Sequence, residues 1–137
     1  MKYWQINENK LVTALLKKIR KEWLTCKVLK HADKITSGVP DISVTARKKT
    51  SWWEVKWAEP LIDTPGIQYA TCSQLAAYGD CWYVIYGRDN DGEFTAIAPP
   101  SGVDFRSGTF VSYRRTDGID HDFVLAAMRR LHFGQEI

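Results

Sequence analysis

The sequence lacks any hydrophobic run that approaches the ~20 residues a membrane-spanning helix needs. Its first ten residues, MKYWQINENK, also lack the apolar stretch of a signal peptide. Internal repeats and low-complexity tracts are absent as well. These absences predict a cytoplasmic protein with no membrane partner. The 137 residues fit one domain with one hydrophobic core, spanning residues 1–137.

Cysteine and histidine are few and scattered. The three cysteines, Cys26, Cys72 and Cys81, form no CxxC pair and no even set. A disulfide framework and a zinc site are therefore not expected, and the cysteines are best interpreted as core residues. The three histidines are likewise far apart in the sequence and suggest no metal-binding pair.

The chain also carries little excess charge of either sign, with a net charge of only +3. The basic residues nevertheless gather in four groups: Lys17, Lys18, Arg20 and Lys21; Arg47, Lys48 and Lys49; Arg114 and Arg115; and Arg129 and Arg130. Such groups can neutralise phosphates, but each could equally be a solvated face of the protein.

Hydrophobic periodicity predicts alternating helices and strands. The predicted helices cover residues 8–24, 64–78 and 121–132, and the predicted strands cover residues 27–30, 41–46, 51–57, 81–87, 93–98 and 108–114. Asp120 is the expected N-cap of the last helix, in which Phe123, Ala127 and Arg130 or Leu131 share one side. This order predicts an α/β fold of the α+β type, with a central mixed sheet flanked by helices. The core would cover about residues 8–98, with residues 99–137 as a C-terminal extension.

Charged residues interrupt the predicted hairpin of residues 41–57. Alternation places Asp41 and Ser43 on the polar face of one strand, with Glu54 and Lys56 on the polar face of the other. If RKKT forms a four-residue loop, Ser43 lies opposite Glu54 and Asp41 lies opposite Lys56. Asp41 and Glu54 would then be diagonal neighbours at ~7–8 Å.

Two carboxylates and one lysine on one patch suit metal-assisted hydrolysis. Neighbouring carboxylates repel each other unless a cation neutralises them, and Mg²⁺ prefers such oxygen ligands. A water bound to the metal could be the nucleophile, and Lys56 could orient it or stabilise the transition state. The alternative is a surface hairpin in which Lys56 only forms an ion pair with Asp41.

The segment VPD, followed after twelve residues by EVK, resembles the PD-(D/E)XK nuclease motif through Pro40, Asp41, Glu54 and Lys56. More narrowly, the chain resembles the VRR-NUC and Holliday-junction-resolvase-like branch. That branch has an acidic residue at the start of its first helix, then GxPD, then ExK, and then a helix with a glutamine near its start. The corresponding residues are Glu8, Gly38, Pro40, Asp41, Glu54, Lys56 and Gln68, and the resemblance covers about residues 8–87.

The resemblance implies a restriction-endonuclease-like core and a metal-dependent endonuclease that hydrolyses DNA phosphodiester bonds. It implies catalytic roles for Asp41, Glu54, Lys56 and Gln68. It implies a Mg²⁺ site, which Mn²⁺ could also fill, formed by Glu8, Asp41, Glu54 and the backbone carbonyl of Val55. Two choices stay open: Glu22 also lies near the apolar stripe of the first helix, and Gln74 shares the second helix with Gln68.

The expected substrate is DNA, with a preference for branched, junction or flap structures, because little chain remains to build a base-reading module. Residues Arg47, Lys48, Lys49 and Lys18 are the predicted nucleic-acid contacts. A compact nuclease of this type would be expected to work as a homodimer. Two other functions remain open: a nucleic-acid-binding module of the same fold without catalysis, and a sequence-specific restriction-type endonuclease that reads bases through residues 99–119.

Overall fold

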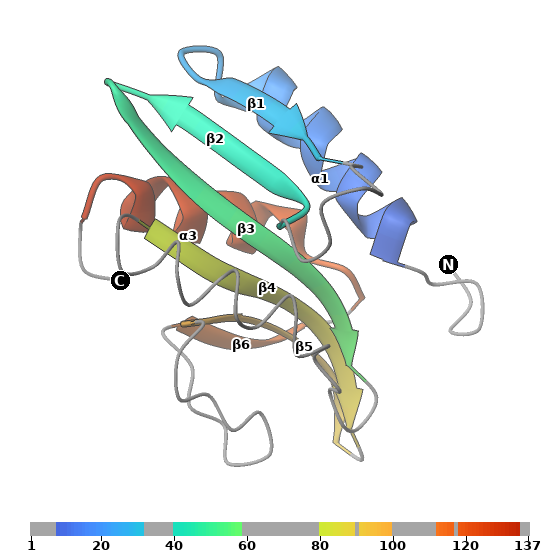
Figure 1. Ribbon diagram of the computed structural model, residues 1–137. Coiled ribbons are helices and arrows are strands. Elements are labelled where there is room, and N and C mark those ends of the chain that lie inside the picture. The colour runs from blue at the N-terminus through green and yellow to red at the C-terminus, as the bar shows by residue number, and fades with distance from the viewer. Residues whose placement is uncertain are drawn as a thin grey trace.

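The computed structural model describes residues 8–31, 40–58, 80–89, 91–99, 112–116 and 118–134. Its elements are α1 (Glu8–Glu22), β1 (Lys27–Lys30), β2 (Ile42–Ala46), β3 (Lys49–Ala58), β4 (Asp80–Asp89), β5 (Gly92–Ala98), β6 (Ser112–Thr116) and α3 (His121–His132) (Figure 1). The helix predicted for residues 64–78, with Gln68 and Gln74, lies outside the described residues, and so does Cys72.

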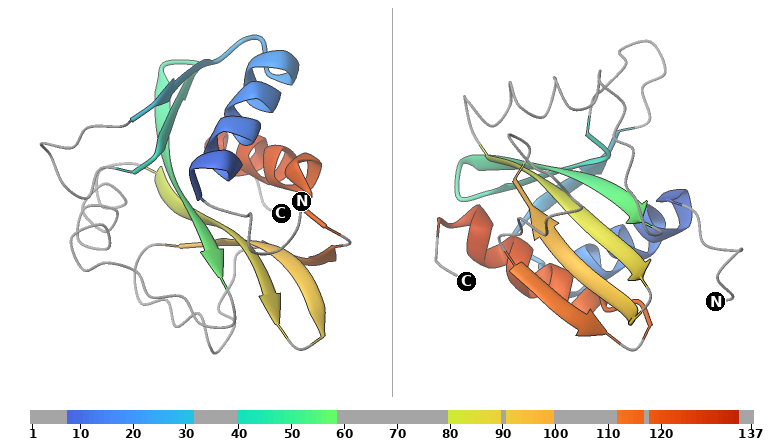
Figure 2. Two further views of the ribbon diagram at one scale, coloured as in Figure 1. Left: turned by 90° about the vertical axis from the view of Figure 1, so that its right-hand side faces the viewer. Right: turned by 90° about the horizontal axis from the view of Figure 1, so that it is seen from below.

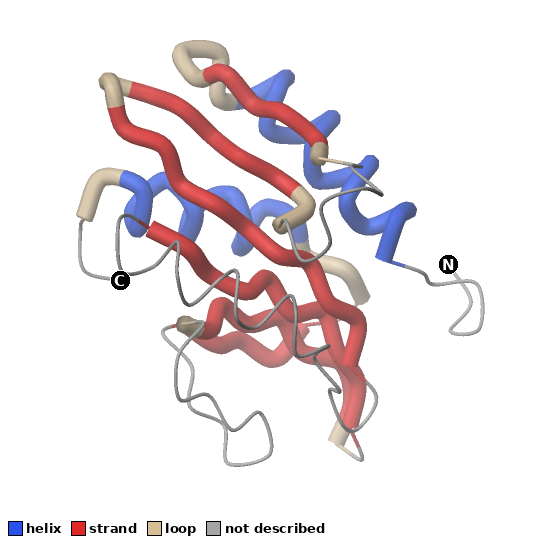
Figure 3. Tube along the Cα trace, viewed as in Figure 1, coloured by secondary structure: helices blue, strands red, loops and turns tan. Residues whose placement is uncertain are grey.

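The six strands form one sheet in which spatial order follows chain order, from β1 to β6 (Figure 3). Every neighbouring pair is antiparallel except β3 and β4, which are parallel. The prediction of an α+β protein with a mixed sheet is therefore confirmed. The parallel pair lies at the centre of the sheet and joins two antiparallel halves, β1–β3 and β4–β6.

Both described helices pack on one face of this sheet (Figure 2). The predicted amphipathic stripe of α1 is buried there, with Leu15 and Ile19 fully covered. The residues of the sheet that face the helices include Val28, Ile42, Val44, Ala46, Trp53, Val55, Val84, Tyr86 and Ile97. Burial of each large apolar side chain stabilises the fold by about 1.5–3 kcal/mol. Helix α3 contributes further core residues to this layer, among them Val124 and Met128.

The turn of the β2–β3 hairpin is shorter than the sequence predicted. Only Arg47 and Lys48 connect the strands, with φ angles of 52° and 63°. A two-residue turn with positive φ at both positions matches the right-handed twist of the flanking strands. The pairing of Ala46 with Lys49 therefore replaces the four-residue RKKT loop.

This shorter turn also corrects the predicted register. Ser43 pairs with Trp52 instead of Glu54, a shift of two residues. An even shift keeps every side chain on its predicted face. Continuing the register from the Ile42–Trp53 pair places Asp41 opposite Glu54, so the predicted pairing of Asp41 with Lys56 is wrong.

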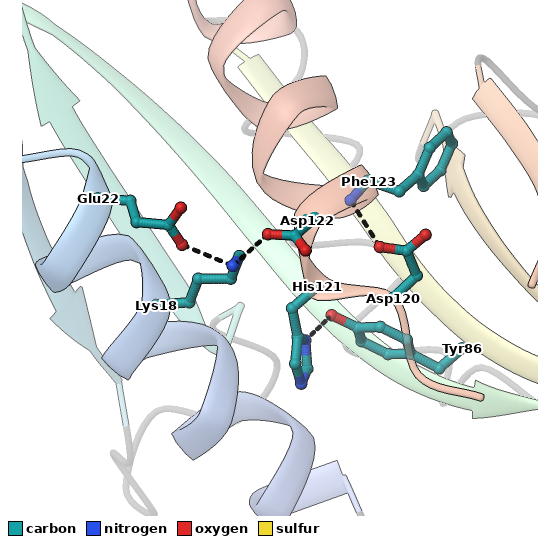
Figure 4. Close-up of polar contacts among 7 residues, drawn as sticks. All are labelled: Lys18, Glu22, Tyr86, Asp120, His121, Asp122 and Phe123. Atoms are coloured by element: carbon teal, nitrogen blue, oxygen red, sulfur yellow. Dashed lines mark hydrogen bonds and ion pairs between the residues drawn. The ribbon is translucent and has the colours of Figure 1, made fainter. Parts of the chain in front are cut away.

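Polar contacts join α1 to the first turn of α3. Lys18 extends from α1 and forms ion pairs with Glu22 and Asp122 (Figure 4). Its hydrogen bond with Asp122 raises the pKa of Lys18 and lowers the pKa of that carboxyl group. Asp120 caps α3 as predicted, because its Oδ1 accepts a hydrogen bond of 3.0 Å from the backbone N–H of Phe123.

Next to this contact, the hydroxyl of Tyr86 lies 2.7 Å from Nδ1 of His121. Burial raises the pKa of Tyr86 and keeps its phenol protonated, so the hydroxyl donates to the neutral imidazole. Burial is also the main cause that lowers the pKa of His121, and the charge of Lys18 adds to the effect, while Asp120 and Asp122 oppose it.

Acidification should therefore destabilise the protein through His121. Its pKa in the folded state lies below the ordinary value of 6.5, so the unfolded chain takes up the proton first. The stability that the neutral ring contributes is complete above pH 6.5 and is lost as the pH falls toward the folded pKa. Urea unfolding at pH 7.5 and about 5.5 should give a smaller difference in His121→Gln than in the wild type. Equal differences in the two proteins would contradict this assignment.

Candidate active site

Asp41 lies directly before the first residue of β2, Ile42, next to the part of β3 that extends past the β2–β3 ladder. The backbone N–H of Val55 donates a hydrogen bond of 2.9 Å to Oδ2 of Asp41. Continuing the hairpin register places Pro40 opposite Val55, and proline has no N–H with which to extend the ladder. The carboxylate of Asp41 thus binds the β3 backbone beyond the Ile42–Trp53 pair, at which the β2–β3 ladder stops.

Glu8 contacts the same strand two residues further along. As the first residue of α1, it accepts a hydrogen bond of 3.3 Å at Oε1 from the backbone N–H of Trp57. Glu22, the alternative candidate, forms an ion pair with Lys18 at the other end of the helix. Of the two acidic residues, the structure therefore brings Glu8 to the strand that carries the ExK motif.

Glu54 and Lys56 lie on the face of β3 that points away from α1 and α3. Glu54 is 1% exposed and Lys56 is 6% exposed. Their neighbours in β4 are Tyr83 and Ile85, which are fully buried. The predicted alternative of a surface position is therefore wrong for Glu54 and Lys56. Burying charges of both signs is costly, so these positions call for compensation by opposite charge and hydrogen bonds.

The oxygen atoms of this region suit a hard divalent cation. Carboxylates and a carbonyl are the ligands that Mg²⁺ prefers, and Mg²⁺ usually keeps several waters. The contact of Asp41 with the backbone of Val55 brings these two predicted ligands together, with Glu54 next to them. In the described part of the chain, however, no group of three or more His, Cys, Asp or Glu side chains is close enough to hold a metal ion.

The predicted nucleic-acid contacts do not gather at this site. Lys18 lies between the helices, and Arg47, Lys48 and Lys49 are exposed at the β2–β3 turn. Lys49 lies five positions from Glu54 along the extended strand β3, which corresponds to about 17 Å. The basic residues of the β2–β3 turn are therefore well separated from Glu54.

One further side chain near Asp41 was missed by the sequence analysis. Nε2 of His31 lies 2.7 Å from the hydroxyl of Ser43, and its ring centre is 5.1 Å from that of Trp52. The backbone N–H of His31 donates to the carbonyl of Asp41 at 2.8 Å. The only signal was its position directly after the predicted strand of residues 27–30, and that signal does not reveal the antiparallel pairing with β2. The imidazole thus lies against Ser43 and Trp52, while the backbone of the same residue is bonded to Asp41.

No protein-family model matches the chain, and a comparison with curated proteins finds no significant similarity. Neither described helix has the length and apolar character that a bilayer-spanning helix requires. The functional interpretation consequently depends on the residues themselves and on their geometry.

Proposed function

We propose that the protein is a metal-dependent endonuclease of the PD-(D/E)XK type, with a restriction-endonuclease-like core. The observation that carries this proposal is the hydrogen bond between the Val55 N–H and Asp41. It brings the aspartate of the PD motif to the strand segment that holds Glu54 and Lys56. The motif residues, which are separated by twelve positions in the sequence, thus lie on one part of the sheet.

In this proposal, Asp41, Glu54 and the Val55 carbonyl hold Mg²⁺ or Mn²⁺, and Glu8 completes the set. When bound, such a metal supplies Lewis acidity and lowers the pKa of a coordinated water. Lys56 has the complementary role of orienting the attacking water and stabilising the negative charge that develops on the phosphoryl group. Its burial strengthens this interaction, because a low-dielectric environment screens charge less than water does.

The side chains available favour catalysis over binding alone. A module that only binds nucleic acid has no need to bury Glu54 and Lys56 beside each other, since buried charges reduce stability unless they are compensated. We further propose that the substrate is branched, junction or flap DNA, bound mainly through its phosphates, and that the enzyme acts as a homodimer. A restriction-type enzyme would instead need a base-reading segment, for which residues 99–119 are the available part of the chain.

A cleavage assay tests this function directly. The protein is incubated with end-labelled four-way, flap, single-stranded and linear duplex DNA in Mg²⁺, Mn²⁺ or EDTA. We expect cutting with either metal and none in EDTA, with branched DNA cut faster than duplexes of equal length. A dispersed positive surface contacts several phosphate backbones at once at a junction, which is the reason for this preference.

Several unrelated DNA sequences and a Glu54→Gln protein serve as controls in this assay. Cutting that follows one short sequence motif, whatever the branching, would support the restriction-type enzyme. Equal cutting by Glu54→Gln would remove Glu54 from the active site. Binding of DNA without cutting in either metal would support the noncatalytic module.

A further inference from the structure

A basic site lies away from the carboxylates of the candidate active site, between the β2–β3 turn and the last turn of α3. It is a hollow of about 400 Å³ lined by Arg47, Ala126, Arg129, Arg130 and Phe133. Three of the five lining residues carry positive charge and none carries negative charge. Arg47 comes from the β2–β3 turn, and Arg129 and Arg130 come from α3, more than 80 positions later in the sequence.

Aromatic rings support two of these guanidinium groups. The guanidinium carbon of Arg47 lies 4.9 Å from the ring centre of Phe133, and that of Arg129 lies 5.8 Å from the ring of Trp23. The two rings contact each other edge to face at 5.9 Å. Stacking on an aromatic face leaves the N–H groups at the rim of a guanidinium available for an anion. Within the described ranges, none of the three arginines forms an ion pair.

A buried histidine holds the two walls of the hollow together. His132, in the last turn of α3, is fully buried, and its Nε2 lies 3.0 Å from the carbonyl of Ala46, next to Arg47. Because a carbonyl only accepts, Nε2 carries the proton, and Nδ1 accepts a hydrogen bond of 2.7 Å from the hydroxyl of Ser51. The indole N–H of Trp53 donates in turn to Ser51 at 2.9 Å. These hydrogen bonds hold α3 at a fixed distance from the β2–β3 hairpin, and so they fix Arg129 and Arg130 relative to Arg47.

The charge balance of the hollow favours anions. The C-terminal end of a helix carries about −0.5 of an elementary charge, which is small beside three guanidinium groups. This helix dipole explains why Arg129 and Arg130 suit the end of α3, but it does not explain Arg47, which another element brings to the same place. Guanidinium groups also match the oxygen pairs of a phosphate in a bidentate geometry.

We propose that this hollow binds the phosphodiester backbone of nucleic acid, with Arg47, Arg129 and Arg130 as the phosphate contacts. The assignment to DNA rests on the proposed nuclease function. Arg47 belongs to the turn that directly precedes Lys49, the first residue of β3. From Lys49 to Glu54 the strand covers about 17 Å, which corresponds to about five base pairs at 3.4 Å each. The hollow thus anchors a segment of the DNA away from the phosphate that is cut.

Fluorescence anisotropy with labelled DNA in EDTA tests this proposal. The Arg129→Gln/Arg130→Gln protein should bind at least about tenfold more weakly than the wild type at moderate salt, and its slope of log K against log salt should be smaller by about 1.8. The matched control is Lys17→Gln/Arg20→Gln, which removes the same charge from a separate hollow lined by Thr13, Leu16 and Lys30. This control should bind within about threefold of the wild type. Thermal melting of both variants verifies that they are folded.

Equal losses in the two double variants would overturn the proposal, because net charge alone would then explain binding. A wild-type affinity in Arg129→Gln/Arg130→Gln would overturn it as well. At equal ionic strength, inorganic phosphate should displace DNA from the wild type better than chloride does, and it should lose this advantage in Arg129→Gln/Arg130→Gln. The same advantage in both proteins would overturn the proposal. Because the assay needs no cleavage, its result stands apart from the nuclease proposal, which Glu54→Gln tests by cutting.

Discussion

Replacing Lys56 by methionine should slow DNA cleavage at least about 100-fold, while DNA affinity changes by less than about threefold. Methionine keeps most of the aliphatic volume at this buried position but removes the ammonium group. The role proposed for Lys56 belongs to the chemical step, so its loss should reduce the rate at saturating enzyme. Single-turnover cutting of a flap or four-way substrate measures the rate, and anisotropy in EDTA measures the affinity.

Asp41→Asn is the control that separates the two roles at this site. It should also lose cleavage, but for a different reason, because it weakens the metal site. Mn²⁺ should raise the melting temperature of the wild type and of Lys56→Met by mass action, and it should raise that of Asp41→Asn less. Cutting by Lys56→Met at the wild-type rate would leave Lys56 with a structural role only, and equal Mn²⁺ shifts in all three proteins would exclude Asp41 as a ligand.

Replacing His132 by leucine should lower the free energy of unfolding by about 2–4 kcal/mol. Leucine fills similar space but leaves the Ala46 carbonyl and the Ser51 hydroxyl without their hydrogen-bond partner. Each buried polar group that loses its partner costs about 1–3 kcal/mol. Equilibrium unfolding in urea measures the loss, and a change below about 0.5 kcal/mol would show that the histidine contributes no more than an apolar side chain does.

Ser51→Ala provides a companion variant, because it removes the middle member of the chain from Trp53 to His132. In the double variant, the loss of unfolding free energy should be smaller than the sum of the losses in Ser51→Ala and His132→Leu, because both substitutions break the same buried network. Additive losses would show that the two residues act independently.

The sequence predicted the bounds of the helices and strands better than it predicted which residues contact each other across the fold. The bounds of α3 were confirmed because Asp120 is a strong N-cap and the apolar repeat that follows it is regular. The buried side of this helix was predicted only in part. Ala127 is buried and Phe123 and Leu131 pack against the core, whereas Arg130 is exposed. The buried Val124, Leu125, Met128 and His132 were not in the predicted set. A histidine breaks the apolar pattern, and its partners, Ala46 and Ser51, lie over 80 positions away.

The hairpin shows the same limit at the candidate site. A period of two assigns each residue to a face, so Asp41, Glu54 and Lys56 were correctly placed on one side of β2 and β3. It does not say which residues are opposite, and the positive φ angles that Arg47 and Lys48 adopt gave no signal in residue type. The contact of Glu8 with Trp57 depends on the packing of α1 against the sheet, and the sequence analysis did not predict it; the family resemblance implied Glu8 only as a metal ligand.

The parallel pair of β3 and β4 has a consequence for how the chain folds. Paired residues across it, such as Ser51 and Asp80, are 29 positions apart, whereas the β2–β3 hairpin closes over a two-residue turn. Loop-closure entropy therefore favours formation of the two antiparallel halves before they join. Glu54 and Lys56 belong to the first half, but their neighbours Tyr83 and Ile85 belong to the second. These two charges thus remain hydrated until the halves meet, and the late joining step carries the cost of their desolvation.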